Sequence, residues 1–143
     1  MKSPEPPLTR VVFFQVRDTP TKLQRICETA HLHFERKEPL LILAHDEKSQ
    51  KFVDELLWKM PSASFLPHIA TDEETQEFIA IAKIKKNINK ARIAFNLCST
   101  PLLLDGPFRI IYEFEDLTEP NKKRLSGLRF DRYKEAGHLI EAR

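Results

Sequence analysis

The residues that could carry out chemistry are few and lie at strand ends. His45 and Asp46 follow one predicted strand, and Asn96 and Cys98 lie at the end of another. An α/β enzyme places its functional groups at strand ends, where Cys98 could serve as a nucleophile. A thiolate needs a base or a helix N-terminus to activate it, and none is evident near Cys98. We therefore favour a structural interpretation, in which Asp46 caps a helix, His45 lies on a surface loop and Cys98 is buried. A small α/β enzyme of unknown substrate that uses these residues stays an alternative.

The spacing of the His, Cys and Gly residues predicts neither a metal site nor a phosphate-binding loop. His31 and His33 are two residues apart on a predicted helix, so they face different directions and cannot share a metal ion. Neither cysteine has a Cys or His at metal-ligand spacing. A phosphate-binding loop needs several glycines close together, whereas the glycines here are scattered: Gly106, Gly127 and Gly137. We expect no catalytic residue, no metal site and no cofactor.

Short apolar runs alternate with segments of helical periodicity, and this order positions the residues above. The runs predict five buried strands, at 10–16, 40–44, 78–81, 92–97 and 108–114. Three helices are predicted, opened by Thr19-Pro20, by Asp46 and by Thr118-Glu119-Pro120, and Gly137 can end the last. Strands that alternate with helices favour parallel pairing. We predict a three-layer α/β/α, Rossmann-like sandwich with a mostly parallel sheet, an antiparallel edge at the alternating strand 108–114, and no nucleotide-binding loop.

Length and charge limit the classes of protein that fit. The chain has 143 residues, which suits a disordered tail at 1–9 and a single α/β domain at 10–143. Its 23 Lys and Arg residues nearly balance 21 Asp and Glu residues, so a histone-like binder is excluded and any basic site must be local. Two cysteines, a polar N-terminus and the lack of any run of ~18 apolar residues predict a cytoplasmic protein.

Two segments have the composition of contact surfaces. The only tryptophan, Trp58, ends an amphipathic helix, and Phe65, Leu66 and Pro67 follow in a loop that contains two prolines. Large aromatic groups on a rigid scaffold are typical interface anchors, although packing of Trp58 and Phe65 into the core stays open.

The final predicted helix is rich in cations and aromatics. Its candidate binding residues are Lys123, Arg124, Arg129, Phe130, Tyr133 and Lys134. Lys122, Arg129 and Tyr133 are spaced by seven and four residues, so they share one helix face. Cations around aromatics suit an acidic peptide, and they suit a nucleic-acid backbone equally well. A solvated charged face stays open, as does weak direct nucleic-acid binding by this helix together with the lysine-rich segment 83–90.

Several segments resemble the chi subunit of bacterial DNA polymerase III. The stretch from Asp46-Glu47-Lys48 to Leu56-Leu57-Trp58, with 64–68 after it, looks like the helix and loop of that subunit. The run 93–97 is similar to its later strand ending in Asn-Leu, and 129–137 resembles its closing basic helix ending in Ala-Gly. In this order the likeness spans about 11–140, nearly the whole chain.

The resemblance implies a Rossmann-like fold and a non-catalytic accessory subunit of the polymerase III holoenzyme. Such a subunit bridges the clamp loader, through the psi subunit, or an accessory helicase, to the acidic C-terminal tail of single-stranded-DNA-binding protein, and so associates with DNA indirectly and with no membrane. The psi-side contacts match Trp58 and Phe65, with Leu66 and Pro67 beside them. The tail contacts match the basic helix at Lys123, Arg129, Tyr133 and Lys134, and Arg124 and Phe130 are predicted to bind the tail beside them.

The final helix also departs from the family pattern. Gly127 stands where a further basic residue is frequent, Asp131 stands where Lys is frequent, and Phe130 replaces a Tyr. The first two changes weaken the expected positive pocket.

Overall fold

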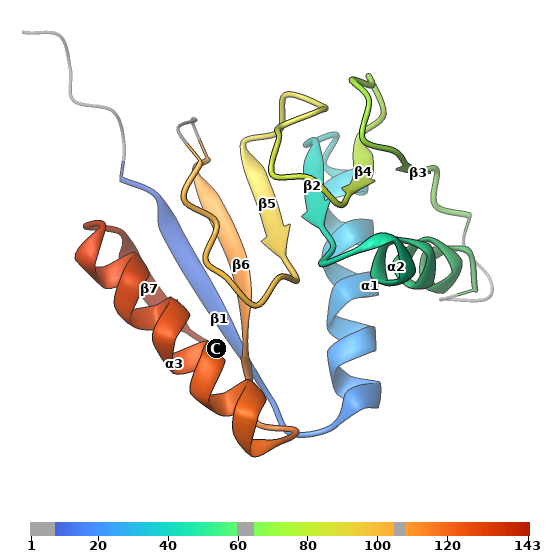
Figure 1. The fold of residues 1–143 in the computed structure, drawn as a ribbon. Helices are drawn as coiled ribbons and strands as arrows, with labels where there is room; N and C mark the ends of the chain where they lie inside the picture. The colour runs from blue at the N-terminus through green and yellow to red at the C-terminus, as the bar shows by residue number, and fades with distance from the viewer. Residues whose placement is uncertain (1–7, 60–64, 105–107) are drawn as a thin grey trace, which may run out of the picture.

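The computed structural model describes residues 8–59, 65–104 and 108–143, which form an α/β fold (Figure 1). Within these residues, three helices and seven strands follow one another in the order β1 Arg10–Val16, α1 Thr19–Glu35, β2 Leu40–Leu43, α2 Glu47–Lys59, β3 Ile69–Ala70, β4 Ile79–Ala82, β5 Ile93–Asn96, β6 Ile110–Asp116, α3 Pro120–Glu135 and β7 Leu139–Ala142. Most of the expected tail, residues 1–7, lies outside the described residues. Thr9, also expected in that tail, donates from its hydroxyl to the Phe108 carbonyl oxygen at 2.7 Å.

The strands form one sheet in the order β3-β4-β2-β5-β6-β1-β7. Every pairing among the described strands is parallel, which confirms the mostly parallel sheet. The antiparallel edge is wrong, because β6 pairs with β5 on one side and β1 on the other. The polar residue Glu113 of β6 does not face water, because it is fully buried under α3.

Two apolar layers cover the two faces of the sheet, so the predicted α/β/α sandwich is confirmed. One layer includes Ile26 of α1 and Leu57 of α2, packed on alternate residues of the central strands. The other includes Tyr133 of α3 together with Leu102 and Phe108 from the segment between β5 and β6. Within the described ranges, no helix has the length and apolar character required to cross a membrane.

Helix ends follow the local chemistry of the sequence. Asp46 caps α2 as expected, since its side chain accepts from the Ser49 N–H at 2.8 Å. The first helix is capped one residue before the expected Thr19, because the Asp18 carboxylate accepts from the Thr21 N–H at 2.7 Å. At the end of α3, Gly137 has a φ of +82°, a conformation that glycine adopts without a steric penalty.

Candidate functional site

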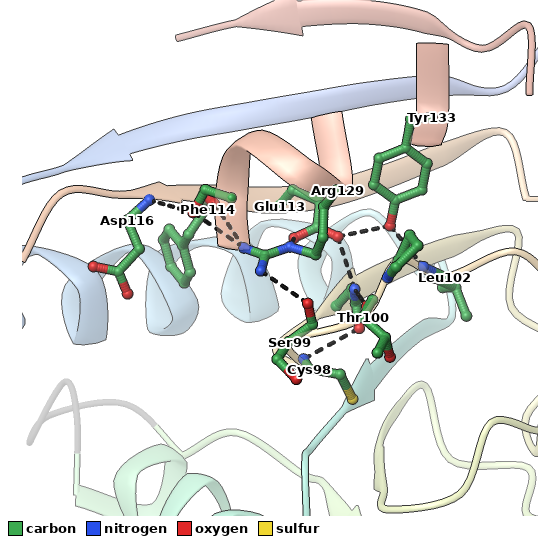
Figure 2. A network of polar contacts seen from close by, with 12 residues as sticks. Cys98, Ser99, Thr100, Leu102, Glu113, Phe114, Asp116, Arg129 and Tyr133 are labelled. Atoms are coloured by element: carbon green, nitrogen blue, oxygen red, sulfur yellow. Dashed lines mark hydrogen bonds and ion pairs between the residues drawn. The ribbon is translucent and has the colours of Figure 1, made fainter. Parts of the chain in front are cut away.

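The sheet-facing polar side chains of α3 meet a carboxylate of β6 in the protein interior. Glu113 Oε1 accepts a hydrogen bond from Arg129 Nε at 3.0 Å. Its Oε2 accepts from Tyr133 Oη at 2.6 Å and from Asn96 Nδ2 at 2.7 Å. All four side chains are buried. Asn96 ends β5 and Glu113 lies on β6, and Figure 2 shows Arg129 and Tyr133 of α3 directed toward the Glu113 carboxylate. One carboxylate therefore joins these three elements.

The same network ties the segment after β5 to the final helix. Arg129 Nη1 donates to the Ser99 carbonyl oxygen at 3.2 Å, and the Leu102 N–H donates to Tyr133 Oη at 2.8 Å (Figure 2). The remaining guanidinium N–H group, at Nη2, lies within hydrogen-bond distance of the Phe114 carbonyl oxygen at 3.1 Å. Because Arg129 directs its donors to internal acceptors, its role is to hold α3 against the sheet.

Burial sets the titration of this network. It raises the pKa of Glu113 to about 7, against the opposing effects of the Arg129 cation and of the hydrogen bonds from Tyr133 and Asn96. Burial, followed by the adjacent Glu113 carboxylate, raises the pKa of the Tyr133 phenol. Tyr133 is therefore a hydrogen-bond donor throughout the physiological range, and Glu113 is the group that changes charge near neutral pH.

The six expected tail-binding residues fall into two groups. Lys123, Arg124 and Lys134 are exposed, and Phe130 is 39% exposed, with its ring centroid 5.7 Å from that of Phe13. Arg129 and Tyr133 are buried and bind Glu113 instead. The positive pocket expected on this helix therefore cannot include Arg129 and Tyr133, because the face that these two residues share is the one that α3 turns toward the sheet.

Sequence reasoning missed the buried carboxylates that receive these side chains. Glu113 and Asp116 are not among the predicted site residues, yet both are buried beside them. The signal was present in the spacing: Ser126, Arg129 and Tyr133 recur at helical intervals, and they are the buried residues of α3. A polar buried stripe looks like a solvated face until the acidic partner on the neighbouring strand is known.

The expected docking residues are split between surface and core. Trp58 is 50% exposed and Phe65 is 73% exposed, and their ring centroids are 5.4 Å apart. The Trp58 ring also packs on buried His68, at 4.2 Å between centroids. Leu66 is 1% exposed and joins the core, so it cannot contact a partner directly, and Pro67 is half-buried. Residues 60–64, between the two aromatics, lie outside the described residues. The structure thus presents Trp58 and Phe65 as an exposed aromatic pair.

The lysine-rich segment 83–90 is engaged within the chain. Lys83 forms an ion pair with Asp72, and Lys86 Nζ lies 3.9 Å from a carboxylate oxygen of Glu74. Lys85 Nζ donates to the Thr100 hydroxyl at 2.8 Å. These contacts reduce the positive charge that the segment offers to a nucleic-acid backbone, so the geometry does not favour this alternative.

A cleft of about 570 Å³ lies at the carboxyl edge of the sheet. His45, Asn96 and Cys98 all line it, whereas Asp46 caps α2 instead. The Asn96 amide donates to Glu113, and the Cys98 thiol lies 3.5 Å from the Ala44 carbonyl oxygen. Three of the four strand-end residues therefore meet in one cleft.

The cleft lacks the pairing that covalent catalysis needs. Burial raises the pKa of Cys98, which favours the unreactive thiol over the thiolate. Within the described part of the chain, the thiol makes hydrogen bonds only to the Leu43 and Ala44 carbonyl oxygens, so no base activates it. Among the same residues no group of three or more His, Cys, Asp or Glu side chains could hold a metal ion. The described residues of the cleft therefore do not form an activated nucleophile around Cys98.

Comparison with known families agrees with the fold and with the segments described above. The model of a family described as DNA polymerase III chi subunit, HolC, matches residues 8–141 of the 143-residue chain. The match includes all three helices, the buried network, the exposed aromatic pair and the cleft. A search of curated proteins found no match. Because the family match extends over nearly the entire sequence, the chain belongs to the DNA polymerase III chi subunit family.

Proposed function

We propose that this protein is a docking subunit of the replication machinery with two separate contact surfaces. One surface binds a psi-like clamp-loader subunit or an accessory helicase, and the other binds the acidic C-terminal tail of single-stranded-DNA-binding protein. Family membership supports an accessory role in DNA replication without catalysis by the chain itself. The observation that carries the proposal is the exposed aromatic pair of Trp58 and Phe65.

The aromatic pair has the properties of an interface anchor. The two adjacent rings expose apolar surface, and its burial in a partner's pocket would be favourable. Aromatic residues are also enriched among the residues that dominate binding energy at interfaces. Trp58 is held in place by the buried His68, whose Nδ1 lies 2.7 Å from the Leu66 carbonyl oxygen. A preorganised anchor loses little conformational entropy when it binds.

The acidic tail fits an exposed stripe of α3, which we define as Lys123, Gly127, Phe130 and Lys134. These positions are three or four residues apart, so they lie along one helix face. The two lysines attract carboxylates, and Phe130 offers an apolar contact between them. Arg124 adds an exposed cation beside the stripe. Arg129 and Tyr133 hold α3 against the sheet and do not touch the peptide.

The two surfaces are tested separately with the purified full chain. Titration with the tail peptide of the cognate single-stranded-DNA-binding protein at low salt, where screening is weakest, should give saturable binding. Lys123→Glu should weaken it, whereas Lys51→Glu, which reverses an exposed charge on α2, should not. Trp58→Ala should abolish capture of the psi-like subunit or helicase and leave tail binding unchanged. Absence of saturable tail binding would overturn the tail assignment, and partner capture by Trp58→Ala at wild-type strength would overturn the docking assignment.

A further inference from the structure

The cleft at the carboxyl edge of the sheet lies where the chain changes direction. Strands β2 and β5 are parallel neighbours. After β2 the chain continues through α2 toward β3 and β4, whereas after β5 it leads to β6 on the opposite side of that pair (Figure 1). Connections that leave adjacent strands in opposite directions create a crevice in which α/β proteins bind ligands. The lining residues His45 and Cys98 come from these two connections.

The cleft combines an apolar lining with several charged side chains. Apolar side chains from α1, the segment after β5 and α3 line it: Leu23, Ile26, Leu97 and Leu125. Phe52 of α2 also lines the cleft and is 50% exposed, so its ring is available to stack on a planar group. The lining also includes two lysines in the first turns of α2 and α3, Lys48 and Lys122, and two acidic residues, Asp116 and Glu119.

These two lysines are the cations that the cleft leaves open for a ligand. Lys22 is held by Asp116 at 2.7 Å, and Arg129 is held by Glu113. Among the described residues, neither Lys48 nor Lys122 has a carboxylate oxygen within 4 Å of its ammonium group. An anion that enters the cleft therefore meets two cations without displacing an existing ion pair.

We propose that this cleft binds a nucleoside monophosphate, with the base stacked on Phe52 and the phosphate between Lys48 and Lys122. The volume of about 570 Å³ falls within the range of small-molecule sites. The absence of glycines at 44–49 and 96–99 means that side chains, and not a backbone cradle, hold the phosphate. This site goes beyond the proposed docking function and is separate from the α3 stripe, because Lys123, Phe130 and Lys134 do not line the cleft.

Amide NMR titration of the full chain with AMP and dTMP tests the site. We expect saturable shifts of backbone amides at 47–49, 97–99 and 121–122, with weaker binding of adenosine and of inorganic phosphate by about tenfold or more each. The double variant Lys48→Glu/Lys122→Glu should lose about tenfold or more in AMP affinity. Its matched control, Lys51→Glu/Lys123→Glu, changes neighbouring lysines on the same helices outside the cleft and should bind AMP normally.

Three outcomes would overturn the proposal. One is the absence of saturable shifts with either nucleotide at about 5 mM. Another is an equal loss of affinity in the two double variants, which would indicate nonspecific charge attraction. The third is displacement of AMP by the tail peptide in wild-type protein and in the Lys51→Glu/Lys123→Glu control alike, which would assign the cleft to the peptide. Retained dispersion in the spectra of both variants establishes that they fold.

Discussion

Arg129 Nε and Glu113 Oε1 are 3.0 Å apart in an ion pair that is buried on both sides and joins α3 to β6. The pair explains why a helix rich in cations does not present all of them to a partner. Breaking one side of such a pair leaves an uncompensated charge in the interior, so the fold itself depends on a residue that looks like a surface binding group.

Tyr133→Phe should destabilise the fold without changing its shape. The variant removes the hydroxyl that donates to Glu113 Oε2 and that accepts from the Leu102 N–H. Leaving buried polar groups without a partner costs about 1–3 kcal/mol, which should appear as a lower midpoint in urea denaturation. The exposed substitution Lys123→Ala, on the same helix, should stay within about 0.5 kcal/mol of wild type. An unchanged midpoint for Tyr133→Phe would contradict the hydrogen bonds assigned to its hydroxyl.

The free energy of unfolding should fall with rising pH because of Glu113. Its pKa rises from an ordinary 4.5 to about 7 on folding, so the folded state holds the proton more tightly than the unfolded state does. The resulting stabilisation is complete below pH 4.5 and is lost as the pH passes 7, by on the order of 3 kcal/mol. Urea denaturation at several pH values, for wild type and Glu113→Gln, measures it.

Comparison of the two pH profiles isolates Glu113 from the histidines. Burial lowers the pKa of His33 and of His138. In both proteins these histidines therefore make the free energy of unfolding rise as the pH rises toward 6.5, which is opposite to the effect of Glu113. The difference between wild type and Glu113→Gln should therefore shrink from acidic to neutral pH. A constant difference across this range would show that Glu113 keeps the same protonation state.

The order of strands and helices is predictable from sequence because it depends on local signals. Apolar runs and caps such as Asp46 predict β1, α1, β2, α2 and α3 close to where the structure has them. The short strands β3 and β7 were missed, since their formation depends on pairing with β4 and β1 and not on their own composition. The prediction of an antiparallel edge was wrong for a related reason. It rested on the polar residue Glu113 in β6, which is buried because it pairs with Arg129, a residue of a later element.

The candidate site was predictable only in part. Spacing correctly placed Arg129 and Tyr133 on one face of α3, but it could not say that this face is buried. Phe65 and Leu66 show the same limit, because neighbours in a loop point in different directions once the chain packs. The cleft joins residues from five separate segments, and no local pattern could bring Phe52 and Lys122 together.

Phe65→Ala and Leu66→Ala should have opposite consequences although the residues are adjacent. Phe65 is 73% exposed, so its truncation should cost well under about 1 kcal/mol of stability and should weaken partner docking. Leu66 is 1% exposed within the core, so its truncation should cost about 2–5 kcal/mol. Urea denaturation and a binding assay on both variants separate the effects. Equal stability losses would mean that Phe65 is not an exposed anchor.

Gly127→Arg should strengthen binding of the acidic tail and also stabilise α3. A Cβ at this position meets no atom within 4 Å, so a side chain fits without rearrangement. Replacing glycine inside a helix by a better helix former contributes about 0.5–1 kcal/mol. The new cation would lie between Lys123 and Phe130 on the exposed stripe, and we expect about a threefold to tenfold gain in tail affinity at low salt. Gly127→Ala is the control, because it should stabilise the helix without the gain in affinity.

A double-mutant cycle on Glu113 and Arg129 should show strong coupling between the two residues. Glu113→Leu leaves a buried guanidinium without its carboxylate, and Arg129→Met leaves a buried carboxylate without its cation. Each single change should cost about 3–5 kcal/mol in urea denaturation at pH 8, whereas the double variant should cost clearly less than the sum of the two. The cost of Arg129→Met should fall at pH 5, since the raised pKa of Glu113 lets the isolated carboxyl take up a proton and become neutral. The cost of Glu113→Leu should not fall in this way, because a guanidinium keeps its charge at both pH values. Additive costs, or equal pH dependence in the two single variants, would contradict the assignment of this pair as the electrostatic link between α3 and β6.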